Sequence, residues 1–423
     1  MARAKSSPSN KKQAQEPTAW IHSTRLHLIM YSALLVATPF VMLQAFLQQA
    51  ISRISRFSFT VAGLDIPIVP AVVLVLVVVL ILIYRAQITR RRIAAGVVAL
   101  LLVAASQQVA DYYAAHRFYD LQHNWHYIAY GLFTFMVYRD LEPRGIPLHR
   151  IMLFTFCAAI LYSSFDEAFQ RHMSNRVFDI SDIAKDSWGS VIGMVLVLAG
   201  GRHSPELFAD WKRLRHKRLR DYLRHPMTLL VLMAVLSFLL VAVGSLLSDY
   251  EHLATTILIT LAIFAVLVIV LHCSQYRFCK YALLAVLVVG VLAQGYFYLK
   301  YRNDNITYNR FGLTIYKGIP LPFFDVMFFP DGSFRLVDKK HNFKQFDRQF
   351  FLQQPMDVLI IGSGAQGRGG NGFPRKVISQ FIYSPFSQRG VQVIIQETPA
   401  ACKIFNRLKK ERKNVLFVLH NSC

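Results

Sequence analysis

The chain has 423 residues, of which 54% are hydrophobic and only 17% are charged, and its formal net charge is +23. Soluble globular chains carry about 25% charged residues, so this composition excludes disordered, collagen-like and disulfide-framework proteins and indicates a membrane protein. Basic loops on one face of a bilayer explain the positive charge better than nucleic-acid binding does. The five cysteines show no metal-binding spacing.

Nine stretches are candidates for membrane-spanning helices, each of which needs about 20 mostly apolar residues. The clear ones lie at roughly 27–46, 66–84, 93–111, 227–247, 252–271 and 281–299. Three weaker ones lie at about 125–138, 151–166 and 183–200, and each carries ionisable or amide residues near one end. Because polar groups are costly in lipid, these three helices are expected to face a protein interior or water and to carry the functional site.

The loop charges predict an orientation. With the N-terminus in the cytoplasm, nine spans place 22 Lys and Arg residues inside and only six outside. This asymmetry follows the positive-inside rule and predicts a multi-pass protein of the bacterial inner membrane. The odd number of spans then puts the C-terminal domain on the outer side.

Composition shifts divide the chain into six parts. These are a disordered basic tail (1–25), two N-terminal spans (26–92), a four-helix membrane domain (93–200), a basic cytoplasmic segment (201–226), three further spans (227–299) and a small α/β or α+β domain (304–423). The fold class is therefore an α-helical polytopic membrane protein with an appended C-terminal domain.

Polar residues gather in two segments on the face predicted to look outward. In the first, His123, His126 and Tyr130 share one helical face. In the second, Asp179, Asp182 and Asp186 follow an acidic pair and a glutamine. The candidate ligand site comprises His126, Tyr130, Asp166, Glu167, Gln170, Arg176, Asp179 and Asp182.

These segments resemble a known family. The block FDEAFQRHMSNRVFDISDIAKDSWGSVIG (165–193) resembles the second signature of the VanZ-like membrane proteins, and His126 with Tyr130 resembles the first. The resemblance covers about 93–200. It departs at Gln122 and His123, where the family has Asp-Lys, and at Asp186, where it has Asn. It implies a link to low-level resistance to teicoplanin-type glycopeptide antibiotics and supplies no biochemical activity.

Four roles for the site stay open. It could bind a polar headgroup or glycan of an envelope lipid, and His126 with Glu167 or Asp166 could form a general acid–base pair. Alternatively, His126, Asp179 and Asp182 could hold a metal ion. In a purely structural role, Arg176 pairs with Asp179 or Glu167 and Asp182 caps a helix. No cofactor is implied, and the expected partners are membrane lipids, a lipid-linked glycan or envelope precursor, and a protein at the C-terminal domain.

Two further patterns predict contacts rather than chemistry. Gly189 and Gly193 form a G-x-x-x-G step, which is typical of close helix packing within a bundle. The basic segment 202–226 is interleaved with apolar residues and is expected to be an interfacial helix on the anionic cytoplasmic leaflet, ending at Pro226.

The C-terminal residues 304–423 alternate in hydropathy as strands do. They predict a hairpin turning at Asp331-Gly332, buried strands at MDVLIIGSG, VQVIIQET and NVLFVLH, and a helix near 374–388. A further helix is expected over PAACKIFNRLKKERK, with Thr398 as its N-cap and Pro399 in first position.

This order of elements resembles the small domain of a mitochondrial complex I assembly factor and its prokaryotic relatives. Ala400, Ala401, Asn406 and Leu408 match the helix of that domain, whereas the insertion 366–373 departs from it. The resemblance implies an assembly or binding role without enzymatic activity.

Two residue patterns in this domain invite a chemical interpretation. Gly362–Gly367 has the G-x-G-x-x-G form of a nucleotide loop, but no helix follows promptly, so a turn near a partner surface is favoured. Cys402 has no neighbouring His in sequence and is expected to be buried packing rather than a nucleophile.

The predicted function is binding of a lipid-linked or cell-surface glycan species, with an effect on envelope properties or glycopeptide resistance. The alternatives are a non-catalytic scaffold or assembly factor acting through the C-terminal domain, and a membrane enzyme acting on a lipid-linked substrate, with His126 and Glu167 as candidate catalytic residues.

Overall fold

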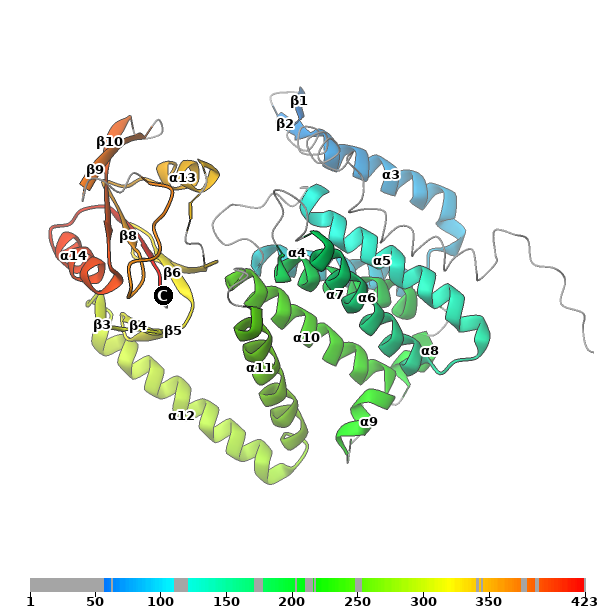
Figure 1. The fold of residues 1–423 in the computed structure, drawn as a ribbon. Coiled ribbons are helices and arrows are strands. Elements are labelled where there is room, and N and C mark those ends of the chain that lie inside the picture. The colour runs from blue at the N-terminus through cyan, green and yellow to red at the C-terminus, as the bar shows by residue number, and fades with distance from the viewer. Residues whose placement is uncertain are drawn as a thin grey trace, which may run out of the picture.

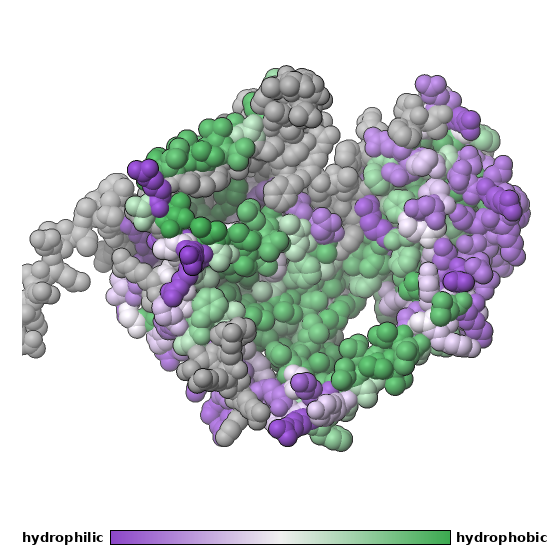
Figure 2. All heavy atoms as spheres, turned by 180° about the vertical axis from the view of Figure 1, so that it is seen from behind, coloured by the Kyte–Doolittle hydropathy of each residue, from purple (hydrophilic) through white to green (hydrophobic). Residues whose placement is uncertain are grey.

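The structure is a computed structural model that describes most of the chain. Its residues are 57–61, 64–109, 121–170, 178–201, 204–209, 216, 218–247, 253–339, 342–343, 345–373, 379–384 and 388–421. Figure 1 shows a bundle of helices and a separate sheet-containing domain, joined through the long helix α12. Figure 2 shows hydrophobic residues over the helices and hydrophilic residues gathered over the C-terminal domain, as expected of a membrane part with an appended domain.

Among the described residues, eight helices form the helical bundle. They are α3 (Ile68–Tyr84), α4 (Arg90–Val109), α5 (Leu121–Leu141), α6 (Leu148–Gln170), α7 (Ile180–Met194, continued by a π-helical stretch Val195–Ala199), α10 (Pro226–Leu246), α11 (Leu253–Cys273) and α12 (Arg277–Tyr301). A short hairpin, β1 (Ser58–Val61) and β2 (Leu64–Pro67), precedes α3.

Among the described residues, five helices have the length and hydropathy of membrane spans: α4, α6, α10, α11 and α12. Helices α3 and α7 have only 17 and 15 residues, and α5 carries ionisable side chains that lower its hydropathy. The predicted span at 27–46 and the basic tail lie outside the described residues. The prediction of nine spans is therefore only partly confirmed.

The basic segment differs from the expected single helix. Its described residues form two short helices, α8 (Ser204–Phe208) and α9 (Leu219–Arg224). The segment ends at Pro226 as expected, and Pro226 opens α10, where its missing N–H costs nothing because the first helical amides have no intrahelical partner.

The helix directions place two functional regions at the same end of the bundle. Gly244, near the end of α10, lies against Ser181 at the start of α7. Two residues further, the Leu246 carbonyl at the end of α10 accepts a hydrogen bond from the backbone amide of Lys339 in the C-terminal domain, at 3.0 Å. The polar start of α7 and the C-terminal domain thus lie at one end, and Arg139, Arg144 and the basic segment lie at the other.

The C-terminal domain contains two sheets and two helices. The six-stranded sheet has the order β7-β6-β11-β8-β10-β9, in which β8 pairs in parallel with β10 and β11, and the three-stranded sheet is β3-β4-β5. The strands are β3 (Ile306–Arg310), β4 (Leu313–Tyr316), β5 (Ile319–Pro322), β6 (Asp325–Phe328), β7 (Phe334–Val337), β8 (Val358–Gly362), β9 (Ser379–Ser384), β10 (Arg389–Gln396) and β11 (Val415–Leu419), and the helices are α13 (Gln345–Leu352) and α14 (Thr398–Lys410).

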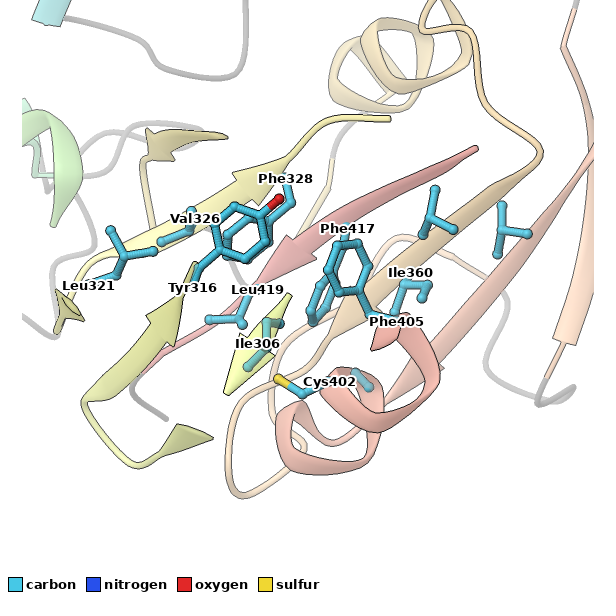
Figure 3. Packing of buried hydrophobic residues seen from close by; sticks show 13 residues of the cluster. Ile306, Tyr316, Leu321, Val326, Phe328, Ile360, Cys402, Phe405, Phe417 and Leu419 are labelled. Carbon is cyan, nitrogen blue, oxygen red and sulfur yellow. The ribbon is translucent and has the colours of Figure 1, made fainter. Parts of the chain in front are cut away.

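Most predicted elements of this domain are confirmed, with two corrections. The helix expected near 374–388 is wrong for its described residues, because 379–384 form the edge strand β9 paired to β10. Thr398 is not the N-cap of α14: Glu397 is, and the Thr398 hydroxyl bonds instead to the Gly364 amide and the His420 carbonyl. Figure 3 shows the apolar core between the sheets and α14, where Phe328 packs against Tyr316 on one side and Phe417 on the other.

Candidate ligand site at the end of the bundle

Glycines bring α5 and α7 into unusually close contact. A Cβ added at Gly189 would lie 2.8 Å from the His126 carbonyl oxygen, and one added at Gly193 would lie 2.8 Å from the Gly131 Cα. Any side chain at either position would therefore push the two helices apart. The prediction of close packing within the bundle is confirmed, and its consequence is that side chains of α5 meet those at the start of α7.

A chain of hydrogen bonds runs from α5 through α7 to α6. The His126 Nδ1 atom lies 2.8 Å from Oδ1 of Asp186, and Oδ2 of the same carboxylate accepts a 2.6 Å bond from the Ser163 hydroxyl. Ser163 and Asp186 are buried, whereas the His126 side chain is 25% exposed. The buried carboxylate thus fixes the Nδ1 edge of the imidazole, and the Nε2 edge faces the Asp182 carboxylate.

A negatively and a positively charged side chain lie next to His126, at the partly exposed side of this hydrogen-bond network. Oδ1 of Asp182 lies 3.7 Å from His126 Nε2 and accepts a 2.8 Å hydrogen bond from the Lys185 ammonium. These side chains are only partly buried, so this rim offers both hydrogen-bond donors and acceptors.

The start of α7 is fixed by two carboxylates. Asp179 caps the helix by accepting a 2.8 Å bond from the Ser181 amide, and the Asp179 amide in turn donates to Glu167 at the end of α6, at 2.9 Å. The capping role expected of Asp182 therefore belongs to Asp179, because the helix begins three residues earlier. Asp182 is left to face His126.

Of the remaining predicted site residues, the structure describes the side chains of Tyr130 and Asp166, and Tyr130 lies beside Ser163 and Asp186. Tyr130 is buried in the apolar core of the bundle, where its ring meets Phe133 edge-on. Asp166 is partly buried, one residue before Glu167 on α6. The side chain of Gln170 and all of Arg176 lie outside the described residues, so the ion pairs expected of Arg176 remain predictions.

Three residues of the site were missing from the predicted set. Asp186 belongs to the acidic stripe with Asp179 and Asp182, a spacing that already signalled it. Lys185 is the one basic residue within that stripe. Ser163 gives no sequence signal beyond being a hydroxyl in an apolar helix.

The geometry favours some of the open roles over others. Within the described part of the chain, no group of three or more His, Cys, Asp or Glu residues is arranged to hold a metal ion. Asp179, a proposed metal ligand, is engaged as a helix cap. The arrangement instead suits hydrogen bonding to a polar group, or proton transfer at His126 Nε2.

A second histidine–carboxylate pair lies inside the C-terminal domain. His420 Nδ1 and Asp325 Oδ2 are 2.5 Å apart, both residues are fully buried, and the Lys339 ammonium lies 3.7 Å from Asp325 Oδ1. Burial alone would raise the pKa of Asp325, but His420, Lys339 and the Asn421 amide outweigh it and hold this pKa below its ordinary value. The carboxylate therefore stays ionised in the folded domain.

The glycine-rich loop after β8 closes on its own domain. The Gly364 amide donates to the Thr398 hydroxyl, and the Gly364 carbonyl accepts from the Thr398 amide at the start of α14. The helix N-terminus that would hold a phosphate is thus occupied by the loop. Cys402 is buried in the core, and burial raises the pKa of its thiol to about 12, so the packing role is confirmed.

Comparisons with known proteins support both resemblances. Residues 28–200 match the model of the VanZ/LLP1 family, and residues 308–420 match a model described as protein of unknown function (DUF498/DUF598). No curated protein matches the chain. A solved structure titled MT938 is 20% identical, with a TM-score of 0.22, and the match covers 28% of this chain and 98% of that one. The chain therefore combines a VanZ-like membrane domain with a complex I assembly factor-like domain.

Proposed function

We propose that this protein binds the polar part of a lipid-linked or cell-surface glycan species at the end of its membrane bundle. The observation that supports this most is the partly exposed His126, which is held by the buried Asp186 and lies beside Asp182 and Lys185. Polar clusters in membrane segments are functional by default, because desolvating them is costly.

The chemistry of the rim fits a glycan better than a simple ion. Sugar hydroxyls both donate and accept hydrogen bonds, and the rim offers a carboxylate acceptor at Asp182 beside an ammonium donor at Lys185. A ligand with a lipid anchor would keep its chain in the bilayer and present its head at the end of the helices.

The proposal also includes the side of the membrane on which the site lies and the effect of binding on the cell envelope. With the basic ends of the helices in the cytoplasm of a bacterial inner membrane, the site and the C-terminal domain face outward. Capturing an envelope glycan there would alter envelope properties and, as in VanZ-like proteins, resistance to teicoplanin-type antibiotics.

The test uses the full-length protein in nanodiscs and a fluorescent prenyl-diphosphate-linked disaccharide as the probe. His126→Asn and Asp182→Asn should each weaken binding by about tenfold, which corresponds to about 1.4 kcal/mol. The matched control is Asp140→Asn, which changes a buried carboxylate at the opposite end of α5. Equal affinities of the His126→Asn and Asp140→Asn variants would refute the proposal.

One observation favours an enzyme as the second candidate. A carboxylate on Nδ1 leaves Nε2 of His126 placed to take or give a proton, as in a general base. Turnover of the same probe, lost in His126→Asn while binding persists, would support this candidate over simple binding.

The Glu167→Ala variant distinguishes the ligand-site proposal from the scaffold alternative. Loss of probe binding at normal membrane abundance supports a ligand site. Loss of abundance alone, with probe affinity retained in the protein that remains, supports a structural cluster and a function carried by the C-terminal domain.

A further inference from the structure

The three-stranded sheet of the C-terminal domain has one covered and one uncovered face. Its inner face buries Thr314, Tyr316 and Leu321 against the rest of the domain. Its outer face is almost entirely apolar, and cross-strand pairing arranges it in two rows. The rows are Tyr308, Ile315 and Pro320, and Arg310, Leu313 and Pro322.

Two aromatic side chains extend this outer face. Phe311, in the β3–β4 turn, is 66% exposed, and Phe323, just after β5, is 56% exposed. Their positions are close because the Phe323 ring packs on Gly312, where an added Cβ would lie 3.2 Å from it. Exposing such large apolar side chains together in water is unfavourable, and contiguous apolar patches mark interaction surfaces.

The sheet is fixed to the end of a membrane span. The side-chain amide of Gln294 on α12 donates a 3.0 Å hydrogen bond to the Gly318 carbonyl in the β4–β5 turn. Gln294 precedes the end of α12 by about 10 Å of helix. The 25 residues of α12 extend about 37 Å, which exceeds the roughly 30 Å of a hydrocarbon core. The β4–β5 turn therefore lies near the level where acyl chains meet headgroups.

The neighbourhood of the turn has the composition of a membrane interface. Tyr296, Phe297 and Tyr298 are exposed on α12 at the same level, and aromatic side chains concentrate at this depth in membrane proteins. Figure 1 shows the sheet on the side of the domain next to the end of α12, and Figure 2 shows hydrophobic surface on the domain beside α12.

We propose that the outer face of the β3-β4-β5 sheet rests on the lipid bilayer that α12 spans, so that the C-terminal domain is a peripheral membrane domain as well as a tethered one. The apolar rows and Phe311 enter the boundary layer, and Arg310 meets lipid phosphates. Addition of a partner strand at the edge strand β5 is disfavoured, because Pro320 and Pro322 have no N–H to donate.

The test measures lipid contact in nanodiscs that hold one copy of the full-length protein. Single cysteines at Phe311→Cys and Tyr308→Cys, in a chain whose native cysteines are replaced, carry an NBD dye. Lipids with a nitroxide just below the headgroup should quench both dyes at least about twofold. The matched control is Phe381→Cys on edge strand β9, at the far side of the domain, where Phe381 is 73% exposed and quenching should be absent.

The outcomes separate lipid from other occupants. Quenching at positions 311 and 308 but not at 381 supports the proposal. Water-like emission at 311 without quenching overturns it, because the face is then in solvent. Blue-shifted emission at 311 without quenching also overturns it, since another part of the chain then covers the face.

Discussion

The two histidine–carboxylate pairs of this chain have the same chemistry in opposite surroundings. His420 and Asp325 are both fully buried, the Asn421 amide donates a hydrogen bond to Asp325, and the Lys339 ammonium lies 3.7 Å from the same carboxylate. His126 is a quarter exposed, and its partner Asp186 is anchored from behind by Ser163.

This difference assigns the two pairs different roles. A buried charge that loses its partner is strongly destabilising, so the pair in the C-terminal domain holds the fold together. The pair in the membrane bundle keeps one nitrogen at a mixed-charge rim, where a ligand can replace solvent. Burial, rather than residue identity, distinguishes the structural pair from the candidate site.

The largest expected effect is on the C-terminal pair. Asp325→Ala leaves Lys339 and the Asn421 amide buried without their carboxylate, and it should destabilise the domain by about 3–5 kcal/mol. Hydrogen exchange of β6 and β11 in the full-length protein measures this loss. Asp331→Ala, in the exposed β6–β7 turn, is the control, and equal effects of the two changes would contradict a structural role for Asp325.

The next effect concerns the contact that assembles the bundle site. Gly193→Ala places a Cβ against the backbone of Gly131, so it should lower the stability of the bundle by about 1–3 kcal/mol. Thermal unfolding in detergent provides the measurement. Gly96→Ala on α4 meets no atom within 4 Å and should be neutral or slightly stabilising. A stable Gly193→Ala variant would show that α5 and α7 are less tightly apposed.

A smaller effect on probe binding is expected from Ser163, which hydrogen-bonds to the carboxylate partner of His126. Ser163→Ala removes the hydrogen bond that orients the Asp186 carboxylate, and it should weaken probe binding by about 1 kcal/mol, or roughly fivefold. Ser164→Ala is the adjacent control, because the Ser164 hydroxyl bonds only locally to the Ile160 carbonyl. If both variants bind equally well, Ser163 does not position the site.

The smallest effect is a pH dependence confined to the C-terminal domain. The lowered pKa of Asp325 means that its stabilisation is present above the unfolded value of about 3.9 and is lost as the pH falls through the lower folded value. Between pH 5 and pH 3, roughly, the wild-type domain should therefore lose more stability than Asp325→Asn does. Parallel acid unfolding curves would argue against this linkage.

Much of the architecture could be predicted from local sequence. Long apolar runs gave eight of the helices, including α10, α11 and α12, because hydropathy and helical spacing are properties of neighbouring residues. The hairpin at Asp331-Gly332 and the buried strands of the C-terminal domain followed from alternation and turn residues. The helix expected near 374–388 failed because pairing with β10, a long-range contact, decides for a strand there.

The sequence by itself determined that this is a membrane protein with a VanZ-like part, an appended α/β domain and a polar cluster on α5, α6 and α7. Only the tertiary structure decided that Asp186, 60 residues from His126, is its partner, that Asp179 rather than Asp182 caps α7, and that Ser163 completes the chain. The reason is geometric: spacing fixes which side chains share a helix face, but the rotation and depth of packed helices, set here by Gly189 and Gly193, decide which faces meet.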